Sequence, residues 1–97
     1  MVELISRNKY DSAEWSQAVA TNYDVSAQTL FSNCKQPSHV VIRVDTAITV
    51  KFDSTSNSAI TVAANTAFEL TNFTFNKIYI TTSGTTAVKI FMSQTTV

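Results

Sequence analysis

The chain has 97 residues, of which 44% are hydrophobic and 14% charged, and its formal net charge is zero. This length allows one domain with a core of its own, and this hydrophobic content disfavours wholesale disorder. The seven Lys and Arg residues are dispersed, which disfavours nucleic-acid binding because that function needs several cations on one face. A single cysteine excludes an internal disulfide.

The N-terminal stretch MVELISRNKY does not have the features of a signal peptide, because no basic start is followed by an apolar run. Elsewhere no apolar run approaches the ~18 residues of a membrane helix. We therefore expect synthesis in a cytoplasm and no membrane partner.

Residues 1–21 show no strand alternation. The stretch DSAEWSQAVA begins with Asp11 and Glu14 at the spacing of a capping box, which predicts one to three helical turns. A helix so short needs something to pack on, and the segment also contains the apolar residues Leu4, Ile5, Tyr10 and Trp15. Two interpretations stay open: the segment packs on its own domain, or it is an arm that orders on a partner. We therefore divide the chain into an N-terminal arm or short helical segment, 1–21, and a β-sandwich domain, 22–97.

From residue 22 onward the dominant period is two. Apolar residues alternate with polar ones in six segments, at 39–45, 47–53, 59–63, 67–70, 77–82 and 87–93. Such alternation among β-branched and aromatic residues is typical of half-buried strands. A seventh, less regular strand is expected at 23–31. The predicted inward residues include Ile42, Val50, Ile60, Ile80 and Ile90.

The triplet Ile-Thr-Val occurs at 48–50 and again at 60–62, and the intervening run DSTSNS has no aliphatic residue. Asp, Ser and Asn side chains bond nearby backbone groups in turns, so this arrangement predicts a hairpin. Short connections at 63–65 and 83–84 imply further antiparallel neighbours, because a parallel return needs a long crossover. The sequence therefore predicts an all-β fold: an antiparallel β-sandwich, with jelly-roll connectivity as one option, preceded by a non-strand N-terminal segment.

No catalytic, cofactor or metal site emerges from the residue types. His39 is the only histidine and Cys34 the only cysteine, and one of each cannot furnish a triad or the usual ligands of zinc. Lys35 beside Cys34 favours a thiolate, but no base accompanies it, so we interpret Cys34 as a structural thiol. The carboxylates do not form the close pair of a glycosidase. We expect no enzymatic activity, no cofactor and no bound metal.

Tyr79 and Phe91 lie out of phase with the inward residues of their segments. Two apolar side chains on the nominal outer face, on strands expected to be neighbours, suggest a second buried surface. The N-terminal segment or another subunit would cover it. A plainer interpretation is a central strand that carries some apolar residues on its outer face.

The block VDTAITVKFDSTSNSAITVAANTAFELTNFTFNKIYITTSGTTAVKIFMS, and above all its phrase IYITTSGTTAVKIF, resembles small virion structural proteins of tailed bacteriophages, which include head-decoration or cement proteins. The resemblance covers roughly residues 40–93. It implies a β-sandwich or jelly-roll body, self-association, often as trimers, and attachment to a capsid or tail surface. The first 35 residues match nothing in that family, so the mode of attachment stays open.

We therefore expect a non-enzymatic virion protein, a decoration or cement protein at the capsid surface, made in the host cytoplasm. Its expected partners are other copies of itself, with a trimer implied by the resemblance, and the major capsid protein or another virion protein. The alternative is a receptor- or carbohydrate-binding domain of a tail fibre, with exposed aromatic residues stacking on sugar. A small enzyme is least favoured, because no acid–base pair is visible. The candidate partner contacts are Leu4, Ile5, Tyr10, Trp15, Tyr79 and Phe91.

Overall fold

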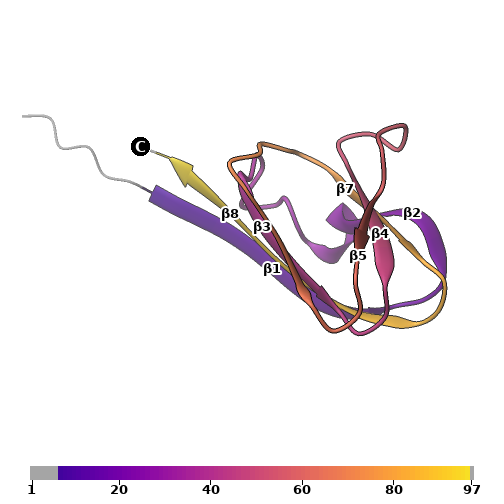
Figure 1. Cartoon of the computed structure of the whole chain (residues 1–97). Coiled ribbons are helices and arrows are strands. Elements are labelled where there is room, and N and C mark those ends of the chain that lie inside the picture. Colours follow the sequence, from indigo (N-terminus) through magenta and orange to yellow (C-terminus); the bar gives the residue numbers. More distant parts are fainter. Residues whose placement is uncertain (1–6, 97) are drawn as a thin grey trace, which may run out of the picture.

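The computed structural model describes residues 7–96, which consist mainly of strands (Figure 1). The strands and one short 3₁₀ helix, η1, follow in chain order as β1 Arg7–Gln17, β2 Ala20–Asp24, η1 Val25–Gln28, β3 His39–Val44, β4 Ile48–Phe52, β5 Ile60–Val62, β6 Ala67–Thr71, β7 Ile78–Thr82 and β8 Thr86–Thr96. The six regularly alternating segments predicted from the sequence correspond to β3 through β8.

The strands form two four-stranded sheets in which all pairs are antiparallel. Sheet A has the order β1-β8-β3-β6, and sheet B has the order β2-β7-β4-β5. The first half of the chain pairs with the second half in reverse: β1 with β8, β2 with β7, β3 with β6 and β4 with β5. The chain is thus one long hairpin rolled into two layers, which is the arrangement of a jelly roll. The predicted antiparallel β-sandwich is confirmed.

The first strand overturns the expectation that the N-terminal segment is not a strand. β1 pairs with β8 over its whole length, from Arg7 opposite Thr96 to Gln17 opposite Thr86. The alternation of β1 is hidden in the sequence, because two of its buried positions are the polar residues Asp11 and Gln17. The capping-box spacing therefore indicated a helix wrongly. Residue 22, where we placed the start of the sandwich, lies inside β2.

The strand predicted at 23–31 is wrong beyond Asp24, where β2 ends and η1 begins. The Asp24 carboxylate accepts a hydrogen bond from the backbone N–H of Ser26 at 3.0 Å, which caps the helix. Thr29 and Phe31 then take left-handed backbone conformations, with φ of 65° and 67°. Such values are uncommon for residues other than glycine and lie outside the β region, so the backbone turns at both residues.

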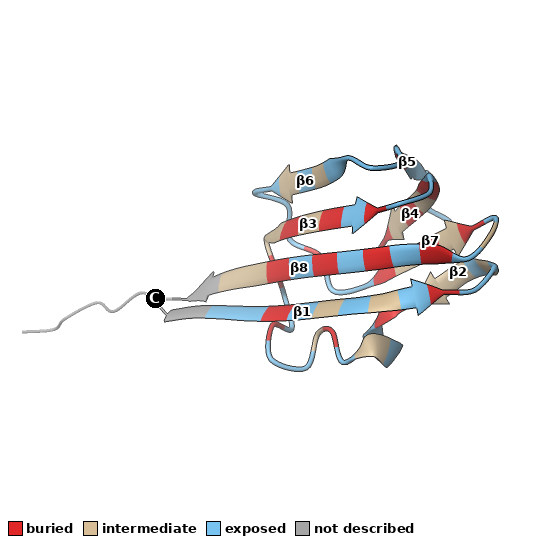
Figure 2. Cartoon of the chain, turned by 90° about the horizontal axis from the view of Figure 1, so that it is seen from below, coloured by how far each residue is buried: buried red, intermediate tan, exposed pale blue. Residues whose placement is uncertain are grey.

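The connection between β2 and β3, residues 25–38, closes one side of the sandwich beside β1 (Figure 2). Its buried side chains include Val25, Leu30, Cys34 and Pro37. The Asp11 carboxylate of β1 holds this connection by accepting hydrogen bonds from the backbone N–H of Cys34 at 2.7 Å and of Asn33 at 3.1 Å. The inward carboxylate of an edge strand is thus satisfied by the segment that covers it.

The core lies between the two sheets and is filled by alternate residues of the central strands. The predicted inward residues Ile42, Val50, Ile80 and Ile90 are each 0% exposed. Ile60 differs, because 37% of its surface is exposed. It lies opposite Val50 on β5, the last strand of sheet B, and no further strand among residues 7–96 covers its outer side. The expected burial of Ile60 is therefore wrong.

The hairpin predicted from the two Ile-Thr-Val triplets is confirmed. β4 pairs with β5 around Thr49 opposite Thr61. Asn57 stabilises the turn by donating a hydrogen bond from Nδ2 to the carbonyl of Phe52 at 2.7 Å. The polar run between the triplets thus acts as the sequence predicts, through side chains that bond nearby backbone groups.

Two other short connections cross from one sheet to the other: 63–66 joins β5 to β6, and 83–85 joins β7 to β8. The expectation that these connections join antiparallel neighbours is wrong. The chain has a single glycine, and left-handed backbone conformations fall on residues such as Asp53, Asn65 and Asn72, with φ of 67°, 58° and 56°. Asp and Asn tolerate this conformation better than other residues with a side chain.

β1 and β8 extend beyond the rest of the sandwich as a two-stranded ribbon (Figure 1). β3 pairs with β8 only from Val88 to Ser93, whereas β1 stays paired with it as far as Thr96.

Replacing Ile80 with Ala should lower the free energy of unfolding by about 2–5 kcal/mol, because its fully buried side chain would leave a cavity. Replacing Thr49 with Ala on the neighbouring strand should cost less than ~0.5 kcal/mol, since its side chain points away from the core. Urea unfolding of both variants measures the difference. Equal costs at the two positions would contradict this assignment of faces.

Replacing Asp11 with Ala should lower the free energy of unfolding by about 1.5–3 kcal/mol, because it removes charge-assisted hydrogen bonds that hold the connection 25–38. The exposed neighbour Ser12, replaced by Ala, serves as the control and should change stability by less than ~0.5 kcal/mol. Amide hydrogen exchange gives a local measurement at Asn33 and Cys34. Unchanged protection of these two amides in the Asp11 variant would contradict the prediction.

Candidate functional site

The outer face of sheet A gathers aromatic, charged and hydroxyl side chains from its four strands. Side chains alternate along each strand, so outward residues that lie opposite one another form rows across the sheet. One row consists of Ser12, Phe91, Val41 and Glu69, and the next consists of Tyr10, Ser93, His39 and Thr71. We call these residues together the aromatic face.

Tyr10 and Phe91 form the apolar centre of the aromatic face. Their rings are stacked, with centroids 5.8 Å apart, and the ring of His39 meets Phe91 edge-on at 6.3 Å. Tyr10 is 61% exposed and Phe91 38% exposed, so both rings present surface to solvent although they pack on each other. Backbone pairing between β1 and β8 holds both residues in place.

His39 links three strands through hydrogen bonds on this face. Its Nε2 lies 2.7 Å from a carboxylate oxygen of Glu69 on β6, and its Nδ1 lies 3.2 Å from Oγ of Ser93 on β8. In the sequence His39 stands alone, because its two partners are distant in the chain. Only the register of β3 with β6 and β8 brings the three together. The available signal was that all three occupy outward positions of alternating segments.

The set of Ser93, His39 and Glu69 matches a hydrolytic triad in residue types but not in its surroundings. A triad acts on a substrate whose oxyanion is held by hydrogen-bond donors aimed at one point. Ser93 lies on β8, which is paired on both sides with β1 and β3, so the nearby backbone groups are engaged in the two ladders. The set therefore supplies oriented hydrogen-bonding groups to a surface.

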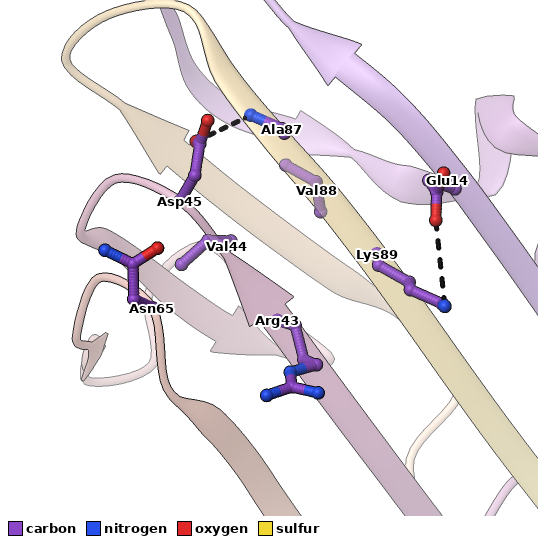
Figure 3. A pocket seen from close by; sticks show the side chains of 8 residues that line it. All are labelled: Glu14, Arg43, Val44, Asp45, Asn65, Ala87, Val88 and Lys89. Atoms are coloured by element: carbon purple, nitrogen blue, oxygen red, sulfur yellow. Dashed lines mark hydrogen bonds and ion pairs between the residues drawn. The ribbon is translucent and has the colours of Figure 1, made fainter.

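A shallow hollow of about 330 Å³ lies at the other end of the outer face (Figure 3). Its charged lining includes Arg43 and the pair of Lys89 and Glu14, whose side chains approach each other from β8 and β1 with an N···O distance of 3.7 Å. The Asp45 carboxylate accepts a hydrogen bond from the backbone N–H of Ala87 at 2.8 Å. Ligand pockets typically span ~300–1,000 Å³, so the volume of this open hollow lies at the lower end of that range. It gives the outer face a border of mixed charge.

Cys34 is fully buried in the connection 25–38. Burial, and secondly the negative charge of Asp11, raise the pKa of its thiol to about 11, while Lys9 acts in the opposite direction. The thiol is therefore protonated at neutral pH and shielded from solvent. These properties agree with the interpretation of Cys34 as a structural thiol.

Trp15 lies on the core side of β1. It packs against the core and against Tyr23, with ring centroids 6.3 Å apart, and its indole N–H donates to Oε1 of Gln17 at 2.8 Å. Two interpretations of the N-terminal segment were open. Residues 7–17 agree with the first, because they pack on the sandwich of their own chain. Leu4 and Ile5 lie outside the described residues, and their contact with a partner stays a prediction.

Tyr79 and Phe91 lie on opposite outer faces of the sandwich. Tyr79 belongs to β7 of sheet B, where it is opposite Asp24 on one side and Lys51 on the other. Phe91 belongs to β8 of sheet A. The expected surface common to both residues is therefore wrong, and Tyr10 is the aromatic neighbour of Phe91.

Within the described part of the chain, no group of three or more His, Cys, Asp or Glu side chains is placed to hold a metal ion. Residues 7–96 also contain no helix with the length and apolar character needed to cross a membrane.

The fold and this surface define a small jelly-roll β-sandwich with an exposed aromatic face. The sequence matches no model of a known protein family. Searches of the curated proteins and of the solved structures found no match either.

The thiol of Cys34 should react slowly with iodoacetamide in the folded protein. At pH 8 a pKa of about 11 instead of the ordinary 9.0 lowers the thiolate fraction by about 100-fold, and burial adds a steric barrier. Mass spectrometry of native and urea-unfolded protein measures both rates, with a Cys34→Ser variant as the unreactive control. Equal rates in the two states would contradict the burial of Cys34.

Proposed function

We propose that this protein is a non-enzymatic virion structural protein, a capsid decoration or cement protein that binds and stabilises the head shell. The observation that carries the proposal is the stacked, solvent-exposed pair of Tyr10 and Phe91 on the outer face of sheet A. Jelly rolls recur among viral capsid domains, although a fold alone does not define a function. The resemblance of residues 40–93 to phage decoration proteins is the second support.

The aromatic face is suited to binding because strands supply its residues. β8 at its centre is bonded to β1 and β3, and His39 ties β3 to both β6 and β8 by hydrogen bonds. A surface that is ordered before binding loses little conformational entropy when a partner arrives. More of the contact energy then remains for affinity.

The composition of the face resembles that of protein interfaces, which combine an aromatic centre with a polar rim. Tyr10 and Phe91 form the centre, and the pairs His39–Glu69 and Lys89–Glu14 lie around it. The chain has a net charge of zero, so many copies can crowd on one shell without strong mutual repulsion.

The proposed partners are the major capsid protein, or another virion protein, and further copies of this chain. The resemblance favours a trimer and a place on the capsid surface. The proposal includes no cofactor, metal, membrane or nucleic acid. Near the aromatic face the described chain offers the cations Arg43 and Lys89, of which Lys89 is paired with Glu14, and nucleic-acid backbones require more positive charge than this.

A second candidate is a receptor- or carbohydrate-binding domain of a tail fibre. The observation that favours it is the position of the His39–Glu69 pair and Ser93 beside the exposed Phe91 ring. Aromatic rings stack on sugars, and neighbouring polar groups bond their hydroxyls. We rank this candidate second because these groups lie on an open sheet and not in a pocket.

Shells assembled from the major capsid protein of the same virus provide the test. Tyr10→Ala and Phe91→Ala should each weaken binding to the shells by about 30-fold, as expected when an aromatic anchor that contributes ~2 kcal/mol is removed. Cosedimentation over a concentration series measures the dissociation constants. Both variants should retain the wild-type circular dichroism spectrum, because their side chains point away from the core.

Tyr79→Ala is the matched control, since it removes an aromatic ring from the opposite outer face. It should bind shells like the wild type. Loss of binding in this variant alone would move the interface to sheet B. A wild type that does not bind shells but binds defined sugars on a glycan array would reject decoration and favour the tail-fibre candidate.

A further inference from the structure

A sandwich of two sheets has two lateral sides, here one beside β1 and β2 and the other beside β5 and β6. These two sides are covered to different degrees. Beside β1, the connection 25–38 runs along the sandwich and is held by hydrogen bonds from the backbone N–H groups of Asn33 and Cys34 to Asp11. Beside β5 and β6, which are the last strands of their sheets, no described segment lies in the equivalent position. We call this second region the β5–β6 side.

Core-facing residues of the β5–β6 side remain in contact with solvent. Ile60 on β5 is 37% exposed, although Val50 opposite is fully buried. Phe68 and Leu70 on β6 are only partly buried, although their partners on β3 are fully buried. Figure 2 shows this change from red on β3 to tan and pale blue on β6. Phe73, two residues beyond the end of β6, is 41% exposed.

β6 is an edge strand whose second edge is unpaired in the described chain. It pairs with β3 residue for residue from Ala67 to Thr71, without a bulge. Edge strands are normally protected against pairing with another chain by a bulge, a covering loop, a lysine, a proline or a very short length. β6 has five residues and contains no lysine or proline; its one charged side chain, Glu69, is paired with His39 of the neighbouring strand β3.

The other three edges have such protection. On β1, Nδ2 of Asn33 donates a hydrogen bond to the carbonyl of Tyr10 at 3.0 Å. The register of β2 shifts between Ala20 and Tyr23, and β5 is only three residues long. β6 is therefore the described edge best suited to accept another strand.

We infer that the β5–β6 side is the self-association surface, covered by the same side of a second copy whose β6 pairs antiparallel with β6 of the first. This inference rests on the self-association in the proposed function and names its surface, and it makes the assembly a dimer in place of the trimer that the resemblance favours. A twofold arrangement is self-complementary, so one edge serves both copies. The apolar side chains of Ile60, Phe68 and Leu70 then pack against the same side chains of the second copy and are removed from solvent.

The charge of β6 permits this pairing in two registers. Its single charged residue is Glu69, and opposite residues of an antiparallel pair share a face. A register centred on Phe68 places Glu69 opposite Ala67 of the second copy, and one centred on Leu70 places it opposite Thr71. Neither register brings the two Glu69 carboxylates together.

The double variant Ala67→Glu, Thr71→Glu tests the inference in the full chain. Both positions are exposed and point to the outer face, so the fold should persist. In either register a new carboxylate lies opposite Glu69 of the second copy and repels it. Sedimentation equilibrium should show a dimer for the wild type. For the double variant it should show a dissociation constant raised at least tenfold.

The double variant Ser12→Glu, Ser16→Glu is the matched control. It adds the same charge to exposed positions of β1, the opposite edge of sheet A, where the new residues flank Glu14 as the test pair flanks Glu69. This control should dimerise like the wild type. Circular dichroism and thermal unfolding of both double variants verify that they are folded.

Three outcomes would overturn the inference. In the first, the wild type assembles, as a trimer or otherwise, and neither double variant weakens the assembly. The chain then self-associates through a surface other than the β5–β6 side. In the second, both variants weaken it equally, which indicates general charge repulsion. In the third, the wild type is monomeric, and shell binding in the cosedimentation test then decides separately whether the proposed function survives. Dimer loss confined to the β6 variant supports the inference even where shells are not bound.

Discussion

The structure depends on the burial of one row of β8, Val88, Ile90 and Met92, between the two sheets. β8 is hydrogen-bonded to β1 on one side and to β3 on the other, so the first and last strands of the described chain lie side by side. Because the side-chain period of a strand is two, burying these residues forces Phe91 and its neighbours outward. The aromatic face is thus a consequence of the core, and a slip of one residue would remove both together.

β1 has polar residues at inward positions because their side chains find hydrogen-bond partners there. Asp11 accepts hydrogen bonds from the backbone of the connection 25–38. Gln17 accepts from the indole of Trp15 at 2.8 Å and donates to the carbonyl of Ala18 at 3.1 Å. Buried polar groups with such partners cost little. The longest connection of the described chain thereby closes a side of the sandwich, whereas in many enzymes a loop of this kind would position catalytic groups.

Periodicity was sufficient to predict the strands that bury large apolar residues at every second position, such as β4 with Val50 and β7 with Ile80. It failed for β1, where Asp11 and Gln17 interrupt the pattern and a local capping signal competes with it. It also failed for the order of strands, because connections of similar length either join paired neighbours or cross between sheets.

The candidate site was less predictable than the fold, because its contacts depend on how the strands are paired. Tyr10 and Phe91 were singled out as apolar residues without an obvious place in the core, but their contact depends on the register of β1 with β8. The hydrogen bonds of His39 depend on two further registers. Registers are set by the packing of the whole sandwich, and a single segment of sequence does not contain them.

Pairing of two copies at β6 would cover the β5–β6 side and would also affect how the aromatic faces are presented. Opposite residues of an antiparallel pair point to the same side of a sheet, so two copies joined at β6 present both aromatic faces in one direction. Their β8 strands would lie five strand spacings apart, about 24 Å at ~4.8 Å for each spacing. A capsid shell presents the same binding site many times. Once one aromatic face of a dimer is bound, the linked second face is held at a high effective concentration near another site, which raises the overall affinity. Two modest contacts then suffice for firm attachment, which suits a neutral sandwich whose described surface has shallow hollows and exposed rings.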